Sequence, residues 1–195
     1  EKEIKDELLN PEELLLGNYF CGIFKEVISD RKTNYFTKSG YFRLNDVGFF
    51  DERGYLYIGG RSDDVINVSG HRIASSEVES ICLSIDEVKE ACAVSRNNEI
   101  SGCKVIIFIS SNLLDDSKKL LLKDSIKRKI ILKLSSYHLP EEIYFFDSLP
   151  KTRSGKIMRR IMRNIANGNV LDTSQDFSTL LNKKEFIDSF KKFNI

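Results

Sequence analysis

The sequence contains 195 residues, enough for one substantial domain or two small ones, because domains commonly run to roughly 100–150 residues. Hydrophobic residues make up 41% and charged residues 30%, which argues against a disordered, fibrous or membrane protein. The formal net charge of +1 excludes a strong overall attraction for nucleic acid.

The first half of the chain predicts a helix and then a β-hairpin. Pro11, followed by two glutamates and a leucine-rich stretch, indicates a helix over residues 11–28. The segment GFFDERGYLYIGG at 48–60 alternates aromatic and aliphatic residues after a turn that ends at Gly54, which indicates a hairpin.

The second half predicts a small sheet covered by helices. Ser76 and Glu79 have the spacing of a capping box ahead of a short helix, and strands are expected at 88–95, 103–110 and 142–147. Apolar residues four apart over 115–134 predict an amphipathic helix, a basic helix runs from Ile157 to about Gly168, and a weaker helix covers 182–193. The fold class is therefore α+β, with a three-stranded sheet flanked by helices.

The loop TRSGK at 152–156 is the first candidate for chemistry. Ser154 and Gly155 are small enough for the backbone to approach a phosphate, and Lys156 is a point charge that can stabilise a reacting acyl phosphate. For an isolated Ser-Gly-Lys, the simpler interpretation is a solvated basic turn.

The segment GRSDDVINVSGHRI at 60–73 is the second candidate. Gly70 permits close approach of a ligand, and His71 and Arg72 supply nitrogen-rich side chains for an anion or nucleotide. A plain loop with a surface histidine is an equally good interpretation of this segment alone.

Asp46, just before the predicted hairpin, is the third candidate. A carboxylate accepts two hydroxyl hydrogen bonds, as a ribose diol requires, and Arg61 stands at the other end of the hairpin. A lone aspartate at such a position is otherwise a turn residue.

Metal and redox chemistry are not indicated. The four cysteines include no Cys-x-x-Cys pair, and the only histidines are His71 and His138, so we expect no metal to be bound by this chain.

The charged N-terminal segment lacks the features of a signal peptide, and the longest apolar run, Val105 to Ile109, is far shorter than the roughly 20 residues that cross a bilayer. A cytoplasmic location without membrane contact is expected, with the nucleus as a further compartment in a eukaryote.

Taken in order, these segments resemble the carboxyl-terminal part of the adenylate-forming superfamily, which includes acyl-CoA synthetases, luciferases and peptide-synthetase adenylation domains. VSGHRI at 68–73 and PKTRSGKIMRR at 150–160 are similar to acetyl-CoA synthetases and their propionyl relatives. The resemblance covers about residues 35–170. Where the family commonly has Thr-Gly-Asp-Gly, this chain has Leu44-Asn45-Asp46-Val47, so the aspartate is kept without its glycine neighbours.

The resemblance implies a role for each matching residue. Lys156 falls on the catalytic lysine of adenylation, Asp46, Arg61 and Arg72 on ATP/AMP contacts, and Asp63 on the hinge between a large and a small domain. The CoA-facing segment corresponds to Ser69, Gly70, His71 and Arg72. No residue matches a further CoA-contacting arginine of the family.

The implied reaction joins acetate, ATP with Mg²⁺, and CoA to give acetyl-CoA, AMP and pyrophosphate by way of acetyl-AMP. Residues 1–62 would be the tail of a large N-terminal adenylation domain, and residues 63–195 a mobile C-terminal domain with a C-terminal extension. The expected partner is that N-terminal domain, without which this chain should be inactive. A protein acetyltransferase and deacetylase acting on Lys156 are further implied partners.

Three alternatives stay open at this point. The first is a synthetase of the same kind whose substrate is propionate or another short-chain acid. The second is a non-catalytic nucleotide- or nucleic-acid-binding module that uses the basic stretch 151–163, although this stretch lacks interleaved aromatics. It lies in a region, residues 148–171, that contains six Lys or Arg and no acid. The third is a regulatory domain that descends from a synthetase and has lost catalysis.

Overall fold

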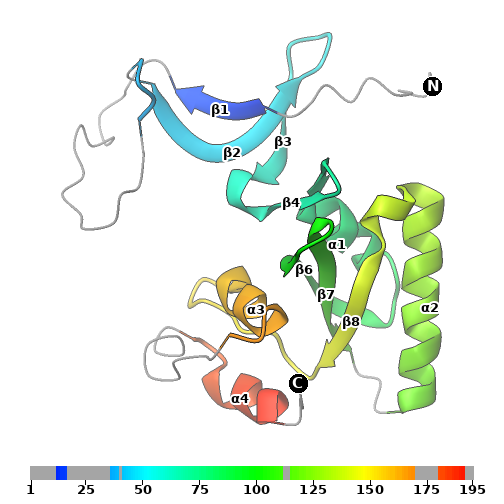
Figure 1. Cartoon of the computed structure of the whole chain (residues 1–195). Coiled ribbons are helices and arrows are strands. Elements are labelled where there is room, and N and C mark those ends of the chain that lie inside the picture. The colour runs from blue at the N-terminus through cyan, green and yellow to red at the C-terminus, as the bar shows by residue number, and fades with distance from the viewer. Residues whose placement is uncertain (1–11, 17–35, 40, 112–114, 170–179, 192–195) are drawn as a thin grey trace. The chain divides into compact units, whose positions relative to one another are not determined.

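A computed structural model describes residues 12–16, 36–39, 41–111, 115–169 and 180–191 (Figure 1). The chain divides into two compact units, residues 1–64 and 65–195. The first unit contains β1 (Glu12–Leu16), β2 (Phe42–Phe50), β3 (Leu56–Arg61) and the short 3-10 helix η1 (Ser62–Asp64). The second contains β4 (Val65–Val68), β5 (His71–Ala74), α1 (Ser75–Leu83), β6 (Val88–Asn98), β7 (Gly102–Ser111), α2 (Asp116–Lys133), η2 (Ser136–His138), β8 (Pro140–Phe146), α3 (Arg159–Ala166) and α4 (Lys183–Lys191).

The first unit is an antiparallel sheet in the order β1-β2-β3. The predicted hairpin is confirmed as β2 and β3, whose turn is closed by the Asp51 carboxylate accepting the Tyr55 N–H at 2.8 Å. The helix predicted over 11–28 is wrong at residues 12–16, which form β1 and pair with β2. A short run of glutamate and leucine does not by itself distinguish helix from strand, and the pairing with β2 decides for the strand. Residues 17–28 lie outside the described residues.

The second unit is built on a sheet in the order β5-β4-β7-β6, with β8 running parallel to β7. The three predicted strands are present as β6, β7 and β8, and the β4–β5 hairpin adds two strands to the expected three. This hairpin joins the sheet only at the start of β7, where Val68 pairs with Gly102.

The sheet of the second unit is buried on both faces, as Figure 1 shows with α2 on one side of β6–β8 and α3 on the other. Alternate residues of β7 belong to different cores: Ile107 and Ile109 pack with α1 and α2, whereas Ile106 and Phe108 pack with α3 and α4. Because side chains of a strand alternate between faces, a strand covered on both sides must be apolar throughout. This accounts for the uninterrupted run of β7.

The helices predicted in the second unit are confirmed, with adjusted ends. The helix expected from Ile157 starts two residues later, because Ile157 pairs with Lys151 in an isolated bridge. The capping box at α1 is wrong: Ala74 is the N-cap residue without a side-chain hydrogen bond, and Glu79 is buried with 8% of its surface exposed. Among the described helices, none combines the length and apolar composition needed to cross a bilayer.

Replacing Ile126 on α2 by alanine should lower the free energy of unfolding by about 3 kcal/mol, because its fully buried side chain would leave a cavity. The matched control is Leu132→Ala on the same helix, where 83% of the side chain is exposed and the change should stay within about 0.5 kcal/mol. Urea unfolding followed by circular dichroism measures both. Equal losses would contradict the assignment of the buried face of α2.

Candidate functional site

The lysine loop, residues 150–158, is a tight turn closed by its own backbone. The Thr152 N–H donates to the Lys156 carbonyl at 2.8 Å, and the Met158 N–H donates to the Pro150 carbonyl at 2.8 Å. The Thr152 hydroxyl also accepts the Lys156 N–H at 3.1 Å. Gly155 has a φ of +82°, a left-handed conformation that glycine adopts without steric cost. The backbone of Lys156 is therefore fixed from both sides.

The two lysines of this loop have different surroundings. Lys151 forms an ion pair with Glu90 at the start of β6. Lys156 is exposed, and no hydrogen-bond or ion-pair partner for its ammonium occurs within the part of the chain that the structure describes. A charge on a fixed backbone with an uncommitted head group is available for an anionic ligand.

The second predicted segment, Ser69–Arg72, forms the turn between β4 and β5. Ser69 and Gly70 have φ values of +50° and +86°, and they join the paired residues Val68 and His71, as in a two-residue hairpin of the type I′ form. The Ser69 N–H donates to the Ser101 carbonyl at 2.9 Å, which ties the turn to the β6–β7 connection. All four residues of the turn are exposed.

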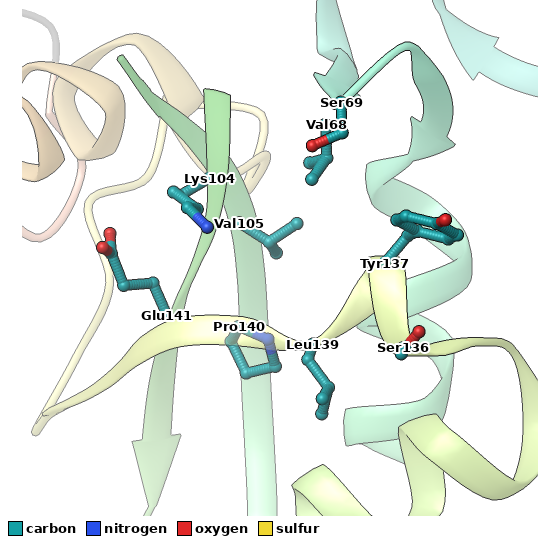
Figure 2. A pocket seen from close by; sticks show the side chains of 9 residues that line it. All are labelled: Val68, Ser69, Lys104, Val105, Ser136, Tyr137, Leu139, Pro140 and Glu141. Atoms are coloured by element: carbon teal, nitrogen blue, oxygen red, sulfur yellow. The ribbon is translucent and has the colours of Figure 1, made fainter. Parts of the chain in front are cut away.

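His71 is held by an aromatic contact. Its ring stacks on Tyr137 of η2, with centroids 3.7 Å apart and planes inclined by 26°. Next to this contact lies a cleft of about 310 Å³. Figure 2 shows Ser69 and Tyr137 on one side of the cleft and Lys104 and Glu141 on the other. The hairpin turn thus borders a hollow whose lining combines hydroxyl groups, the Lys104 ammonium and the Glu141 carboxylate with apolar side chains.

His138 lies beside the stacked pair and is mostly uncharged near neutral pH. Burial lowers its pKa, the Glu77 carboxylate 3.9 Å from Nε2 offsets part of this, and His71 lowers the pKa further. The Ser135 hydroxyl lies 2.9 Å from Nδ1. His138 therefore stabilises η2 through hydrogen bonding rather than charge.

Three predicted residues of the first unit form one charged cluster. The Arg61 guanidinium donates to the Asp63 carboxylate at 3.0 Å and lies 4.0 Å from the Asp46 carboxylate, which is opposite Arg61 in the β2–β3 register. Asn45 has a φ of +56°, so it adopts the left-handed conformation at the position where the family has glycine, and asparagine tolerates this better than most residues. Asp46 therefore takes its place in β2 without the glycine neighbours.

The lysine loop and the hairpin turn emerge at opposite ends of β7. The hairpin joins at Gly102, whereas the lysine loop follows Phe146, which is paired with Ser110. Eight residues of strand separate these positions, which corresponds to roughly 26 Å. The two segments therefore leave the sheet at opposite ends of β7.

The basic helix is not a continuous cationic face. Arg159 is turned inward, and its guanidinium donates to the Glu79 carboxylate at 2.5 Å. This removes one of the charges that a nucleic-acid contact along residues 151–163 would use.

The described cysteines behave as core residues. Cys82 and Cys92 are buried, and burial, with a smaller effect of Glu79, raises the pKa of Cys82 to about 12. The Cys82 thiol is therefore protonated and unreactive at physiological pH. Within the described residues, no group of three or more His, Cys, Asp or Glu side chains is arranged to hold a metal ion.

Comparison with known proteins shows to which family this sequence is similar. Residues 77–156 match the model of the AMP-binding enzyme C-terminal domain, from α1 to the lysine of the loop. The chain carries a C-terminal domain of the adenylate-forming enzymes. An acetyl-coenzyme A synthetase of Leptospira biflexa is 42% identical over 166 residues, covering 82% of this chain and 25% of the relative. That of Nitrosomonas europaea is 40% identical over 144 residues, covering 73% of this chain and 22% of the relative.

Solved structures agree with this family. The anthranilate CoA ligase AuaEII in complex with anthranoyl-AMP superimposes with a TM-score of 0.60 at 27% identity, covering 71% of this chain and 27% of that one. The chain thus spans about a quarter of the length of the curated relatives it matches.

Sequence reasoning missed several residues that support these segments. Tyr137, Glu90 and Asn182 each hold a predicted segment in place. Only Asn182 had a usable signal, since asparagine directly before a helix is a common N-cap residue. The partners of Tyr137 and Glu90 are distant in sequence and follow from the fold alone.

Proposed function

We propose that this chain is the C-terminal catalytic part of an AMP-forming acetyl-CoA synthetase. The lysine loop is the observation that carries the proposal, because it presents the exposed Lys156 ammonium on a backbone fixed by its own hydrogen bonds. The identity of 40–42% to acetyl-coenzyme A synthetases supports the choice of acid. The proposal includes a cytoplasmic site of action.

In the first half-reaction, a carboxylate oxygen of acetate attacks the α-phosphorus of ATP, which is supplied as its Mg²⁺ complex. The new oxygen–phosphorus bond forms as the bond to pyrophosphate breaks. Lys156 would stabilise the negative charge that develops on the transferring phosphate. Asp46 would accept hydrogen bonds from the ribose hydroxyls, and Arg61 would hold that carboxylate in place through their cross-strand pairing.

In the second half-reaction, the thiolate of CoA attacks the acetyl carbonyl of acetyl-AMP, and AMP leaves. Ser69, Gly70, His71 and Arg72 would face CoA in this step, and Arg72 would also lie near the phosphate of the nucleotide. A turn without a Cβ at Gly70, with nothing within 4 Å of the place a Cβ would occupy, leaves room for a narrow ligand to pass the backbone.

A rotation between the two half-reactions follows from this assignment. The Lys156 loop and the Gly70 turn leave opposite ends of β7, so one orientation of the unit toward a fixed substrate would not serve both. Asp63, in η1 next to the division between the two units, is the proposed hinge.

The proposed partners follow from the same reaction. The domain would act on substrates held by an N-terminal domain of the same protein. Acetylation of Lys156 by a protein acetyltransferase would remove the charge that adenylation uses, and a deacetylase would restore it.

The test of the proposal is acetate-dependent exchange of labelled pyrophosphate into ATP by the full-length protein, followed by thioester formation with CoA. We expect exchange with acetate and slower exchange with propionate. Faster exchange with propionate would make the protein a propionyl-CoA synthetase. No exchange with any short acid, together with salt-dependent binding of RNA or DNA, would replace the proposal with a nucleic-acid module.

Replacing Tyr137 by alanine should slow thioester formation from supplied acetyl-AMP by about threefold to tenfold, because an aromatic stack contributes about 0.5–1.5 kcal/mol to holding His71. Acetyl-AMP formation should change less than about twofold. The matched control is Tyr55→Ala, which removes a tyrosine that is 65% exposed and remote in sequence from the turn. A loss confined to adenylation would contradict the role of Tyr137.

A further inference from the structure

The lysine loop is held from outside by a segment that lies beyond the matched family region. Asn182, directly before α4, makes three hydrogen bonds to residues 148–151, the extended segment at the start of the loop. Its side-chain oxygen accepts the Lys151 N–H at 3.0 Å, and its amide donates to the Leu149 carbonyl at 2.7 Å and the Ser148 hydroxyl at 2.6 Å. One side chain thus satisfies two backbone groups of this segment, the Lys151 N–H and the Leu149 carbonyl.

The backbone continues this attachment. The Leu181 N–H donates to the Lys151 carbonyl at 2.9 Å, and Leu180 pairs with Thr152 in an antiparallel bridge. On the other side of residues 151–152 lies the segment that carries Lys156. The two are joined by the Lys151–Ile157 bridge and by the hydrogen bond from the Thr152 N–H to the Lys156 carbonyl. Residues 151–152 are therefore the middle of three short extended segments, with Lys156 on one outer segment and residues 180–182 on the other.

The outer segment is itself anchored in the core by α4. Phe186 is fully buried in the cluster that contains Phe146 and Leu149. Ser189 is 4% exposed, and its hydroxyl accepts the Asp147 N–H at 2.9 Å. Rigidity can therefore be transmitted from the core through α4 and Asn182 to the base of the loop.

We propose that Asn182 is a positioning residue for Lys156, and that residues 180–182 form a brace that fixes the lysine loop for the adenylation step. The proposal rests on the proposed function of Lys156. Loss of the brace would keep the Lys156 ammonium but let its backbone move. A displacement of a catalytic group by about 1 Å can lower the rate about 100-fold.

The test compares two asparagine-to-alanine variants of the full-length protein. Asn182→Ala removes the brace. Asn167→Ala is the matched control, because Asn167 is also half-buried and makes three hydrogen bonds, to the Asn97 N–H and the carbonyls of Ser95 and Arg163, none of them in the lysine loop. Each variant loses one bond accepted from a backbone N–H and two bonds donated by the side-chain amide.

We expect Asn182→Ala to lower kcat for acetyl-AMP formation at least about tenfold, with KM for acetate nearly unchanged and thioester formation from supplied acetyl-AMP within about twofold. Asn167→Ala should leave the ratio of the two half-reactions unchanged. Hydrogen exchange of the Lys151 and Thr152 amides, measured by mass spectrometry, should be faster in Asn182→Ala only. The exchange readout does not depend on catalysis.

Each outcome decides the proposal. Equal loss in both half-reactions, or unchanged exchange at residues 151–152, would overturn the brace. If Asn182→Ala does not fold, Asn182→Asp replaces it, because an aspartate keeps the acceptor for the Lys151 N–H and loses both donated bonds. Its adenylation should then fall selectively, and unaltered adenylation would overturn the brace. A protein in which Lys156→Ala retains adenylation while Asn182→Ala still speeds exchange would disprove the proposed function and keep the brace as a structural feature.

Discussion

Replacing Lys156 by alanine in the full-length protein should lower the rate of acetyl-AMP formation by about 100-fold to 1,000-fold, the usual loss when one preorganised group that stabilises a transition state is removed. Thioester formation from supplied acetyl-AMP should be nearly unchanged, since that step is assigned to the opposite end of β7. Folding should also be unaffected, because the Lys156 side chain is exposed and only its backbone takes part in the loop. Single-turnover assays of each half-reaction measure the two rates separately.

A matched control separates the position of this lysine from its charge. Lys183 is an exposed lysine at the first position of α4, and Lys183→Ala should leave both half-reactions within about twofold. Lys156→Arg keeps the charge with a different shape and should recover only part of the rate. Equal loss in both half-reactions for Lys156→Ala would remove the assignment of this residue to adenylation.

Much of the second unit could be predicted because its signals are local or periodic. The apolar spacing of α2 and the uninterrupted apolar run of β7 arise directly from burial, and both elements are present within one or two residues of the expected ends. The β4–β5 strands were not expected in the sheet, because they join β7 through a single pairing, between Val68 and Gly102. No sequence pattern encodes a contact of that kind.

The candidate site divides in the same way. The lysine loop and the Gly70 turn could be found because glycine, serine and basic residues cluster there within a few positions. The pairing of Arg61 with both Asp46 and Asp63 required the register of β2 and β3. The roles of Tyr137 and Asn182 required tertiary structure, since each acts on a segment more than 25 residues away in sequence. Residues that do chemistry were thus more visible than residues that hold them.

Glu79 illustrates why a local rule failed. Its spacing from Ser76 fits a capping box, yet its carboxylate points into the unit, where it accepts the Ala93 N–H at 2.8 Å and the Arg159 guanidinium at 2.5 Å. A cap contributes about 1 kcal/mol, whereas a buried carboxylate that satisfies a strand amide and a guanidinium prevents larger desolvation costs. The tertiary arrangement therefore prevails over the local one.

Replacing Glu79 by alanine should lower the free energy of unfolding by about 2–4 kcal/mol, because the Ala93 amide loses its acceptor inside the core and Arg159 loses its carboxylate. Glu79→Gln should cost less, since its side-chain oxygen can still accept the Ala93 N–H. The control is Glu87→Ala, an exposed glutamate just before β6, with an expected change within about 0.5 kcal/mol. Urea unfolding measures all three.

A double variant tests whether Glu79 and Arg159 act as a pair. If the contact between the two side chains is their main contribution to the free energy of unfolding, Glu79→Ala combined with Arg159→Ala should be less destabilising than the sum of the single changes, by about 0.5–3 kcal/mol. Strict additivity would mean that Glu79 acts through Ala93 alone. Because Arg159 is the first residue of α3 and follows Lys156 by three positions, coupling would also connect the lysine loop to α1 through the buried carboxylate. Lys156 would then be held at the base of its loop by Asn182 and at the helix that follows by Glu79.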